Sequence, residues 1–172
     1  LYGATKLCSD KLFIAANNMV GKRNLTFSVV RYGNVIGSRG SVVPLFLKDS
    51  KSLGVLTITD PEMTRFMMTL ENAVDLVIYA FKNGNSGDIF VQKSPSTTLK
   101  ELAEAMIKLY NSNVSIKKIG IRHGEKIHET LLSKEERLIS EDLGDYFRIP
   151  ADNRDLNYNK YIKKLITAKE NA

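Results

Sequence analysis

Residues 27–40 read Phe-Ser-Val-Val-Arg-Tyr-Gly-Asn-Val-Ile-Gly-Ser-Arg-Gly, an apolar, β-branched run followed by glycines and small polar residues. The run Phe27–Tyr32 suits a buried strand, and the loop follows at its carboxyl end. An α/β sheet presents its ligand loops at that end. The glycines let the backbone approach a bound group, and Asn34 and Arg39 can donate to phosphate or sugar oxygens. A plain turn is the alternative interpretation of a Gly-rich loop.

The rest of the chain alternates between helical and strand-like patterns. Apolar residues three and four apart predict helices, and short β-branched runs predict strands. Thr98 and Glu101 are placed to form a capping box at the start of one helix. Helices are expected at residues 2–19, 42–53, 71–82, 98–109, 126–132 and 157–168, and strands at 27–32, 55–59, 65–69, 88–92 and 115–121. This alternation predicts an α/β fold.

Length and composition fit one ordinary globular domain, with 172 residues of which 43% are hydrophobic. The single cysteine, Cys8, excludes an internal disulfide and fits a reducing compartment, so we expect a cytoplasmic protein. We expect no membrane span, because the apolar run Ala73–Phe81 is too short and contains Asp75.

The charge pattern limits the classes of ligand. The net charge is +6, from 25 basic and 19 acidic residues. Nucleic-acid binding would need a denser basic stripe and a recognisable module, so no nucleic-acid partner is expected. A mild positive field suits a nucleotide diphosphate, although a solvated basic face explains most of the lysines. His123 and His128 lie on poorly matched helix faces, and no cluster has zinc-ligand spacing, so no metal is expected.

Tyr2 and Lys6 are four residues apart, on one side of the first predicted helix. An ammonium group beside a phenol favours the phenolate and lowers the phenol's pKa from its usual value of about 10. Such a pair suits a base that takes a hydroxyl proton during hydride transfer. The same spacing also arises by chance, so the pair gains weight only from the motifs downstream.

Two further segments place arginines beside predicted strands. Asp60–Phe66 contains Arg65, and Ile121–Lys126 contains Arg122. Two guanidinium groups that converge on one pocket would clamp a pyrophosphate. Glu125, which only accepts hydrogen bonds when ionised, can hold a ribose hydroxyl. Either arginine taken alone also fits a surface ion pair.

In order, these motifs resemble a known family over nearly the whole chain. Tyr2–Lys6 resembles the Tyr-x-x-x-Lys signature of extended short-chain dehydrogenases/reductases. The segments 31–46, 59–66 and 121–129 resemble nucleotide-sugar 4,6-dehydratases of bacterial surface-polysaccharide synthesis. Within that group the chain is most similar to the inverting UDP-N-acetylglucosamine 4,6-dehydratases, which also epimerise C5. The segment 155–158 is similar to the capsule-synthesis branch.

The resemblance implies roles for the matching positions. Tyr2 would take the sugar 4-hydroxyl proton as the C4 hydride passes to a bound nicotinamide, and Lys6 would bind the nicotinamide ribose. Water would then be lost across C5 and C6 and the hydride would return to C6, so that NADP, or NAD, is recycled. The matching cofactor-binding positions are Tyr2, Lys6, Arg31 and Tyr32. The matching substrate-binding positions are Asn34, Arg39, Val43, Pro44, Arg65, Arg122 and Glu125, with Val43 and Pro44 near the uracil.

The resemblance also implies a domain organisation. Residues 1–40 would end a Rossmann-like catalytic domain, and residues 41–172 would form mainly a smaller α/β substrate-binding region, with some segments returning to the core sheet. The Gly-rich dinucleotide-binding turn and the acid/base residues before the Tyr are not in the sequence, which starts at Leu1 without Met. We therefore expect a C-terminal fragment that lacks the dinucleotide-binding half and cannot turn over by itself. His123 stands where related enzymes usually have Pro.

Two alternatives to the dehydratase remain open. A UDP-sugar 4-epimerase of the same fold also uses Tyr, Lys and a nicotinamide, but needs no acid and base for C5 and C6. A nucleotide-sugar-binding module would bind without catalysis. The resemblance further implies a homo-oligomer for the full-length protein, and the sequence does not distinguish NAD from NADP.

Overall fold

The central sheet is assembled from segments that lie far apart in the sequence. The computed structural model describes residues 2–110 and 113–152, and these include a sheet in the order β1 (Val29–Arg31), β5 (Ile89–Gln92), β9 (Tyr146–Ile149) and β8 (Glu141–Asp142). β1 and β5 are parallel, whereas β9 is antiparallel to both of its neighbours. The late segment 141–149 therefore returns to the sheet that begins with β1.

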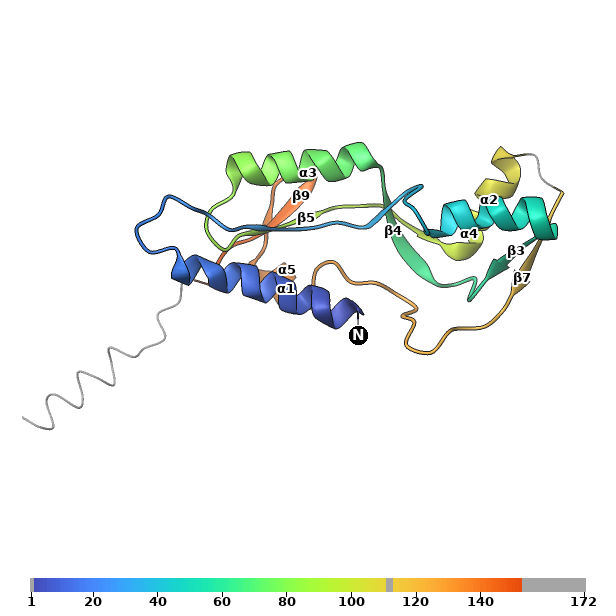
Figure 1. Ribbon diagram of the computed structural model, residues 1–172, viewed down its shortest axis with the longest axis horizontal. Helices are drawn as coiled ribbons and strands as arrows, with labels where there is room; N and C mark the ends of the chain where they lie inside the picture. The colour runs from blue at the N-terminus through green and yellow to red at the C-terminus, as the bar shows by residue number, and fades with distance from the viewer. Residues whose placement is uncertain (1, 111–112, 153–172) are drawn as a thin grey trace, which may run out of the picture.

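Helices cover both faces of this sheet. Figure 1 shows α1 (Tyr2–Ala16) on one side and α3 (Leu70–Asn83) on the other. Side chains alternate along a strand, so neighbouring residues of β1 and β5 pack into different cores. On the α1 side, Ile14 packs against a buried core of Val29, Ile89, Val91 and Ile149. On the α3 side, Val30 packs against a buried core of Leu76, Ala80 and Phe90. Burial on both faces explains why these strands read as continuous apolar runs.

A second group of elements lies at the other end of the molecule (Figure 1). Helices α2 (Val42–Leu53) and α4 (Leu99–Leu109) pack on the parallel pair β3 (Val55–Ile58) and β7 (Ser115–Lys118). Their buried core consists of Phe46, Leu56, Ile58, Ala103 and Met106. The predicted capping box is confirmed, because Thr98 Oγ1 accepts from the Glu101 amide at 3.1 Å and Glu101 Oε2 accepts from the Thr98 amide at 2.8 Å.

Strand β4 (Thr64–Met68) connects the two ends of the molecule (Figure 1). It pairs in parallel with β2 (Asn34–Val35) and antiparallel with β6 (Ser96–Thr98). Gly33 permits this close approach, since a Cβ at that position would lie 2.7 Å from Phe66 Cβ and 2.9 Å from the Phe66 carbonyl oxygen. The loop with Asn34 therefore lies close against β4, next to Arg65 and Phe66.

The predicted α/β fold is confirmed, but the helix expected at 126–132 is wrong. The helix in this region is α5 (Lys134–Ile139), capped by Ser133. The carbonyls of Lys126 and Ile127 accept hydrogen bonds from the Arg65 guanidinium, and the Ile127 carbonyl also accepts from the Thr64 amide. These carbonyls are therefore bonded to β4 and not to a helix of their own.

Other differences are smaller. The first helix ends at Ala16 and is followed by a 3-10 turn, Asn17–Met19. The predicted loop 33–40 contains the short strand β2, and β6, β8 and β9 were not predicted. The helix expected at 157–168 and the motif at 155–158 lie outside the described residues. The domain boundary after residue 40 stays a prediction.

Candidate functional site

A cavity of about 290 Å³ lies where β2, β4 and the start of α2 meet the carboxyl ends of β3 and β7. Most of the predicted substrate-binding residues line it, although they come from four separate parts of the sequence. They are Asn34, Val43, Arg65, Arg122 and Glu125. Arg39 and Pro44 are not among the lining residues. The structure thus brings Arg65, Arg122 and the predicted acceptor Glu125 to one cavity.

A tight turn after β7 places Arg122 and Glu125. The Glu125 amide donates to the Arg122 carbonyl at 3.1 Å, and the Arg122 amide donates to Glu125 Oε2 at 3.2 Å. Gly124 lies within this turn at φ +78°, a left-handed conformation that favours glycine. Thr59 Oγ1 donates to Glu125 Oε1 at 3.5 Å. The Glu125 carboxylate is therefore held toward the cavity from two sides, and Gly124 supplies the conformation that the turn requires.

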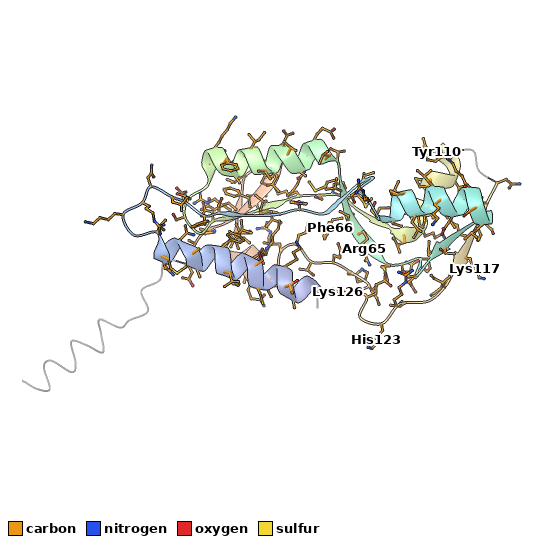
Figure 2. The ribbon with its side chains drawn as sticks, in the orientation of Figure 1. Arg65, Phe66, Tyr110, Lys117, His123 and Lys126 are labelled. Atoms are coloured by element: carbon orange, nitrogen blue, oxygen red, sulfur yellow. The ribbon has the colours of Figure 1, made fainter. Side chains whose placement is uncertain are left out.

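Arg65 fastens the segment after this turn to β4. Its guanidinium donates to the carbonyls of Lys126 at 3.1 Å and Ile127 at 3.2 Å. Two carboxylates lie farther away, with Glu125 Oε1 3.8 Å from Nη2 and Glu129 Oε1 3.5 Å from Nε. We call these five residues the Arg65 cluster. Figure 2 shows Arg65 in the middle of the molecule, with Lys126 on the neighbouring segment.

Glu129 is a member of this cluster to which the sequence assigned no role. With the Asn34 amide oriented to satisfy its neighbours, Nδ2 donates to Glu129 Oε2 at 3.2 Å and to the Phe66 carbonyl at 2.9 Å. Glu129 thus contacts both Asn34 and Arg65, two residues that line the cavity. The quoted motif 121–129 contained Glu129, but only the folded chain shows which residues it reaches.

Arg122 is the cation best placed for an anionic ligand. Its side chain is exposed, and no hydrogen bond or ion pair engages its guanidinium among residues 2–110 and 113–152. The guanidinium of Arg65 lies beside two carboxylates at 3.5 Å or more and is 15% exposed. A guanidinium fork suits the paired oxygens of a diphosphate. The cavity therefore combines arginines that can donate hydrogen bonds to phosphate oxygens, a carboxylate that can accept them, and apolar side chains such as Val43.

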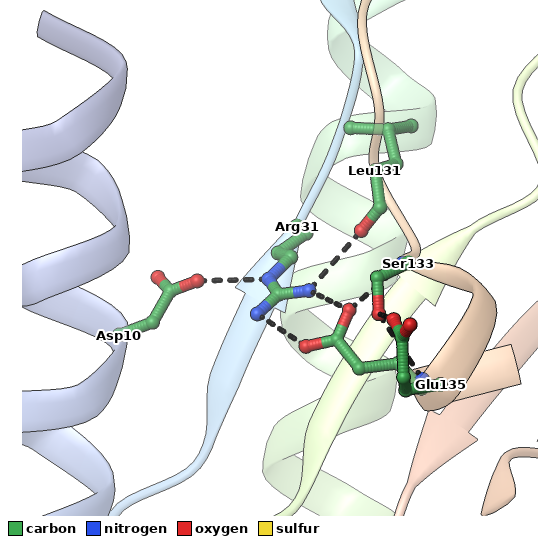
Figure 3. A network of polar contacts seen from close by, with 6 residues as sticks. Asp10, Arg31, Leu131, Ser133 and Glu135 are labelled. Atoms are coloured by element: carbon green, nitrogen blue, oxygen red, sulfur yellow. Dashed lines mark hydrogen bonds and ion pairs between the residues drawn. The ribbon is translucent and has the colours of Figure 1, made fainter.

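Arg31, predicted to bind the cofactor, lies outside this cavity in a network of carboxylates (Figure 3). Nε donates to Asp10 Oδ2 at 2.8 Å, and Nη1 and Nη2 donate to the two oxygens of Glu136 at 2.8 and 3.0 Å. Nη1 also donates to the Leu131 carbonyl at 3.2 Å, and the Ser133 amide donates to Glu136. We call these residues the Arg31 cluster. Two carboxylates within 3 Å balance the charge of this guanidinium inside the protein, and the predicted cofactor role of Arg31 stays a prediction.

The Arg31 cluster shifts the ionisation of its members. Burial lowers the pKa of Arg31, but hydrogen bonds to Glu136 and Asp10 outweigh burial, so its pKa lies above the usual value. Burial likewise raises the pKa of Glu136, but hydrogen bonds from Arg31 and the Ser133 amide outweigh it, so the carboxyl pKa lies below its usual value. Both shifts favour the ion pair.

The remaining predicted positions lie at or near α1 and the Gly-rich loop. Tyr2 is the first residue of α1, and its side chain lies outside what the structure describes. Lys6 is exposed on the same helix, Tyr32 is 47% exposed after β1, and Arg39 is exposed in the loop. Their roles at the cofactor or substrate stay predictions.

Two further properties concern only the described residues. No helix there combines the length and apolar character needed to cross a membrane. Within the same residues, no three His, Cys, Asp or Glu side chains gather as they would around a metal ion.

Comparison with known sequences places the chain in a family. Residues 1–151 match the family described as "Polysaccharide biosynthesis protein". The chain belongs to this family. A UDP-glucose 4-epimerase of Rickettsia bellii (strain OSU 85-389) is 54% identical over 159 residues, which cover 92% of this chain and 47% of that protein. The chain thus spans about half the length of the curated relatives it matches.

Solved structures support the same family fold. Pen from Bacillus thuringiensis is 43% identical, with a TM-score of 0.82 over 91% of this chain and 49% of that one. DesIV, a dTDP-glucose 4,6-dehydratase from Streptomyces venezuelae solved with NAD and TYD bound, is 22% identical, with a TM-score of 0.67 over 79% of this chain and 44% of that one. At that identity the likeness concerns the fold alone. The chain therefore has an α/β fold that matches about half of an extended dehydratase or epimerase structure.

Proposed function

We propose that the protein is a nucleotide-sugar enzyme of polysaccharide biosynthesis that oxidises a UDP-sugar at C4, with 4-epimerisation as the leading reaction. The observation that carries this proposal is the convergence of Asn34, Arg65, Arg122 and Glu125 on one cavity. The relatives at 54% identity named UDP-glucose 4-epimerase support the epimerase over the dehydratase that the sequence motifs favoured.

Within this proposal, the cavity offers a suitable side chain to each part of the UDP group. Arg122 and Arg65 would bind the diphosphate, because paired guanidinium donors match its oxygens. Glu125 would accept a hydrogen bond from a ribose hydroxyl, and Val43 would lie against the uracil ring. The phosphates would be held at one end of the cavity, leaving the sugar to extend toward the N-terminal end of α1.

Tyr2 and Lys6 would then serve the chemical step. Tyr2 takes the proton of the sugar 4-hydroxyl and returns it after the sugar presents its other face, while the Lys6 ammonium favours the phenolate. A nicotinamide cofactor, when bound, supplies the hydride acceptor. Lys6 fits that cofactor as a donor to ribose hydroxyls, whereas the Arg31 guanidinium is bonded to Asp10 and Glu136.

A 4,6-dehydratase is the second candidate, favoured by the motifs at 31–46, 59–66 and 121–129. It would form the same 4-keto sugar but would then lose water across C5 and C6. The inverting form would also change the configuration at C5. Both candidates use the same UDP site, so the product and not the binding site separates them.

The decisive experiment incubates the full-length protein with UDP-glucose or UDP-N-acetylglucosamine, each with NAD or NADP in deuterated buffer, and follows the sugar by proton NMR. An epimerase yields the C4 epimer without deuterium at C5. A dehydratase yields a 4-keto-6-deoxy sugar that carries deuterium at C5. Conversion of neither sugar, with UDP still bound, would leave the binding module as the better account.

A matched pair of variants tests the catalytic assignment. Tyr2→Phe removes the proton acceptor and should lower kcat about 10²- to 10⁴-fold. Tyr110→Phe changes an exposed tyrosine at the end of α4 and should leave kcat unchanged. Unchanged turnover in Tyr2→Phe would remove Tyr2 from the mechanism.

A further inference from the structure

The Arg31 cluster joins three segments that are distant in sequence. Arg31 lies on β1, Asp10 on α1, and Glu136 in the first turn of α5. The three charged side chains are only 14–21% exposed. Figure 3 shows the guanidinium between the α1 helix on one side and the 131–136 segment on the other. Arg31 is therefore the polar link between α1 and this segment, beside the apolar core on which Ile14, Leu131 and Leu132 pack.

The geometry leaves this contact little freedom. Glu136 accepts both ends of the Arg31 fork and also accepts from the Ser133 amide at 3.0 Å. The same carboxylate thus completes the capping box of α5 and binds Arg31. A bidentate pair fixes the orientation of both planes as well as their separation. Rotation of Arg31 would break the contacts on both sides together.

Asp10 links this contact to the predicted proton acceptor. Tyr2, Lys6 and Asp10 follow at intervals of four residues, so they lie along one side of α1. The ion pair of Asp10 with Arg31 at 2.8 Å therefore holds α1 at a point near this row, while Ile14 holds the same helix on the apolar core. Lys6 lies about one helical turn before Asp10, so this contact constrains the part of α1 that contains Lys6.

The segment held at the other side of Arg31 carries the ligand residues. Between residues 122 and 136 it contains Arg122 and Glu125, it is bound by Arg65 at 126–127, and it is bound by Arg31 at 131 and 136. Two arginines thus attach one segment, first to β4 and then to β1 and α1. The substrate cavity and the Tyr2–Lys6 helix are connected through this segment.

We propose that Arg31 is a positioning residue that fixes α1, with Tyr2 and Lys6, against the segment carrying Arg122 and Glu125. Its effect on turnover rests on the proposed function, whereas its effect on α1 does not. Arg31 acts through Asp10 and Glu136 and touches neither substrate nor the reacting atoms. A purely structural ion pair would stabilise the whole fold but would not change the alignment of α1.

The test uses the full-length protein and three conservative variants: Asp10→Asn, Arg31→Lys and Glu136→Gln. Glu104→Gln is the control, because its pair with Lys100 is also a carboxylate–cation contact but is more than half exposed on α4. Hydrogen exchange is measured in peptides from α1 and α3. The three variants should raise exchange in α1 about fivefold to tenfold more than in α3, and the control should change neither helix.

Steady-state kinetics give the second readout. If α1 is misaligned, kcat should fall about tenfold or more while KM for the UDP-sugar stays within about twofold. Equal increases of exchange in α1 and α3, or unchanged exchange in α1, would overturn the positioning role. A wild-type protein without turnover would refute the proposed function alone, since exchange in α1 still decides this inference.

Discussion

The Arg31 and Arg65 clusters place the same side chain in two different environments. Arg31 donates to two carboxylates at 2.8–3.0 Å. Arg65 donates mainly to neutral carbonyls, and its carboxylates lie at 3.5 and 3.8 Å. Both side chains are about equally buried, at 14% and 15% exposed. The difference therefore lies in the acceptors and not in solvent access.

This difference separates a structural arginine from a candidate ligand-binding one. Short bidentate contacts with carboxylates satisfy the charge of Arg31 within the protein. Neutral carbonyls orient Arg65, its two carboxylates lie at 3.5 Å or more, and the residue lines the cavity. An anionic ligand would thus gain more from Arg65 than from Arg31.

Arg31→Met should produce the largest loss of stability, about 3 kcal/mol in the free energy of unfolding, because two mostly buried carboxylates lose their partner. Urea denaturation of the full-length protein measures this loss. Lys100→Met, which removes an exposed partner of Glu104, should cost less than about 1 kcal/mol. Similar losses in the two variants would mean that Arg31 is no more than a surface ion pair.

For ligand affinity, substitution of Arg65 should have a larger effect than substitution of Arg31. Arg65→Lys should raise the Kd for UDP about tenfold, since a lysine lacks the fork that matches a diphosphate. Arg31→Lys should leave this Kd unchanged. Isothermal titration calorimetry with UDP measures both, and since each substitution keeps the positive charge, Arg31→Lys is the matched control for loss of a guanidinium fork. Equal weakening by Arg31→Lys and Arg65→Lys would contradict the division of roles.

The smallest expected effect is an acid-dependent loss of stability in the Arg31 cluster. The pKa of Glu136 is lower in the folded protein than its usual value, since hydrogen bonds from Arg31 and Ser133 outweigh burial. Such a carboxyl stabilises the fold above its unfolded pKa and loses this contribution as pH falls through the folded pKa. Urea midpoints measured from pH 6 downward should fall less steeply in Glu136→Gln than in wild type. An identical slope would exclude this carboxyl as a source of acid sensitivity.

The sequence predicted the elements better than their connections. Apolar spacing indicated α2 and α3, and the Thr98–Glu101 pattern indicated the start of α4, because these signals depend on neighbours within a few residues. The same reasoning failed at 126–132, where Arg65, some sixty residues earlier, takes the carbonyls that a helix would need. Such a bond leaves no periodic signal in the sequence.

For the candidate site, too, the sequence indicated individual residues but not the contacts between them. Gly-rich and Arg-containing motifs indicated Asn34, Arg65, Arg122 and Glu125 as ligand residues, because guanidinium and amide donors suit phosphates and sugars wherever they occur. The sequence could not show that Glu129 contacts both Asn34 and Arg65. Nor could it show that Arg31, in the same motif as Asn34, is bonded to Asp10 and Glu136.

The sequence by itself thus determined the α/β class, most helices and strands, and the residue types that line the candidate site. Hydrophobic periodicity, caps and donor chemistry are local properties, and they are written in neighbouring residues. Only the tertiary structure decided which arginine lines the cavity and which one fastens α1. A guanidinium has the same charge and donors in any sequence. Its role follows from the carboxylates around it, which the fold brings within 3 Å of Arg31 but leaves 3.5 Å or more from Arg65.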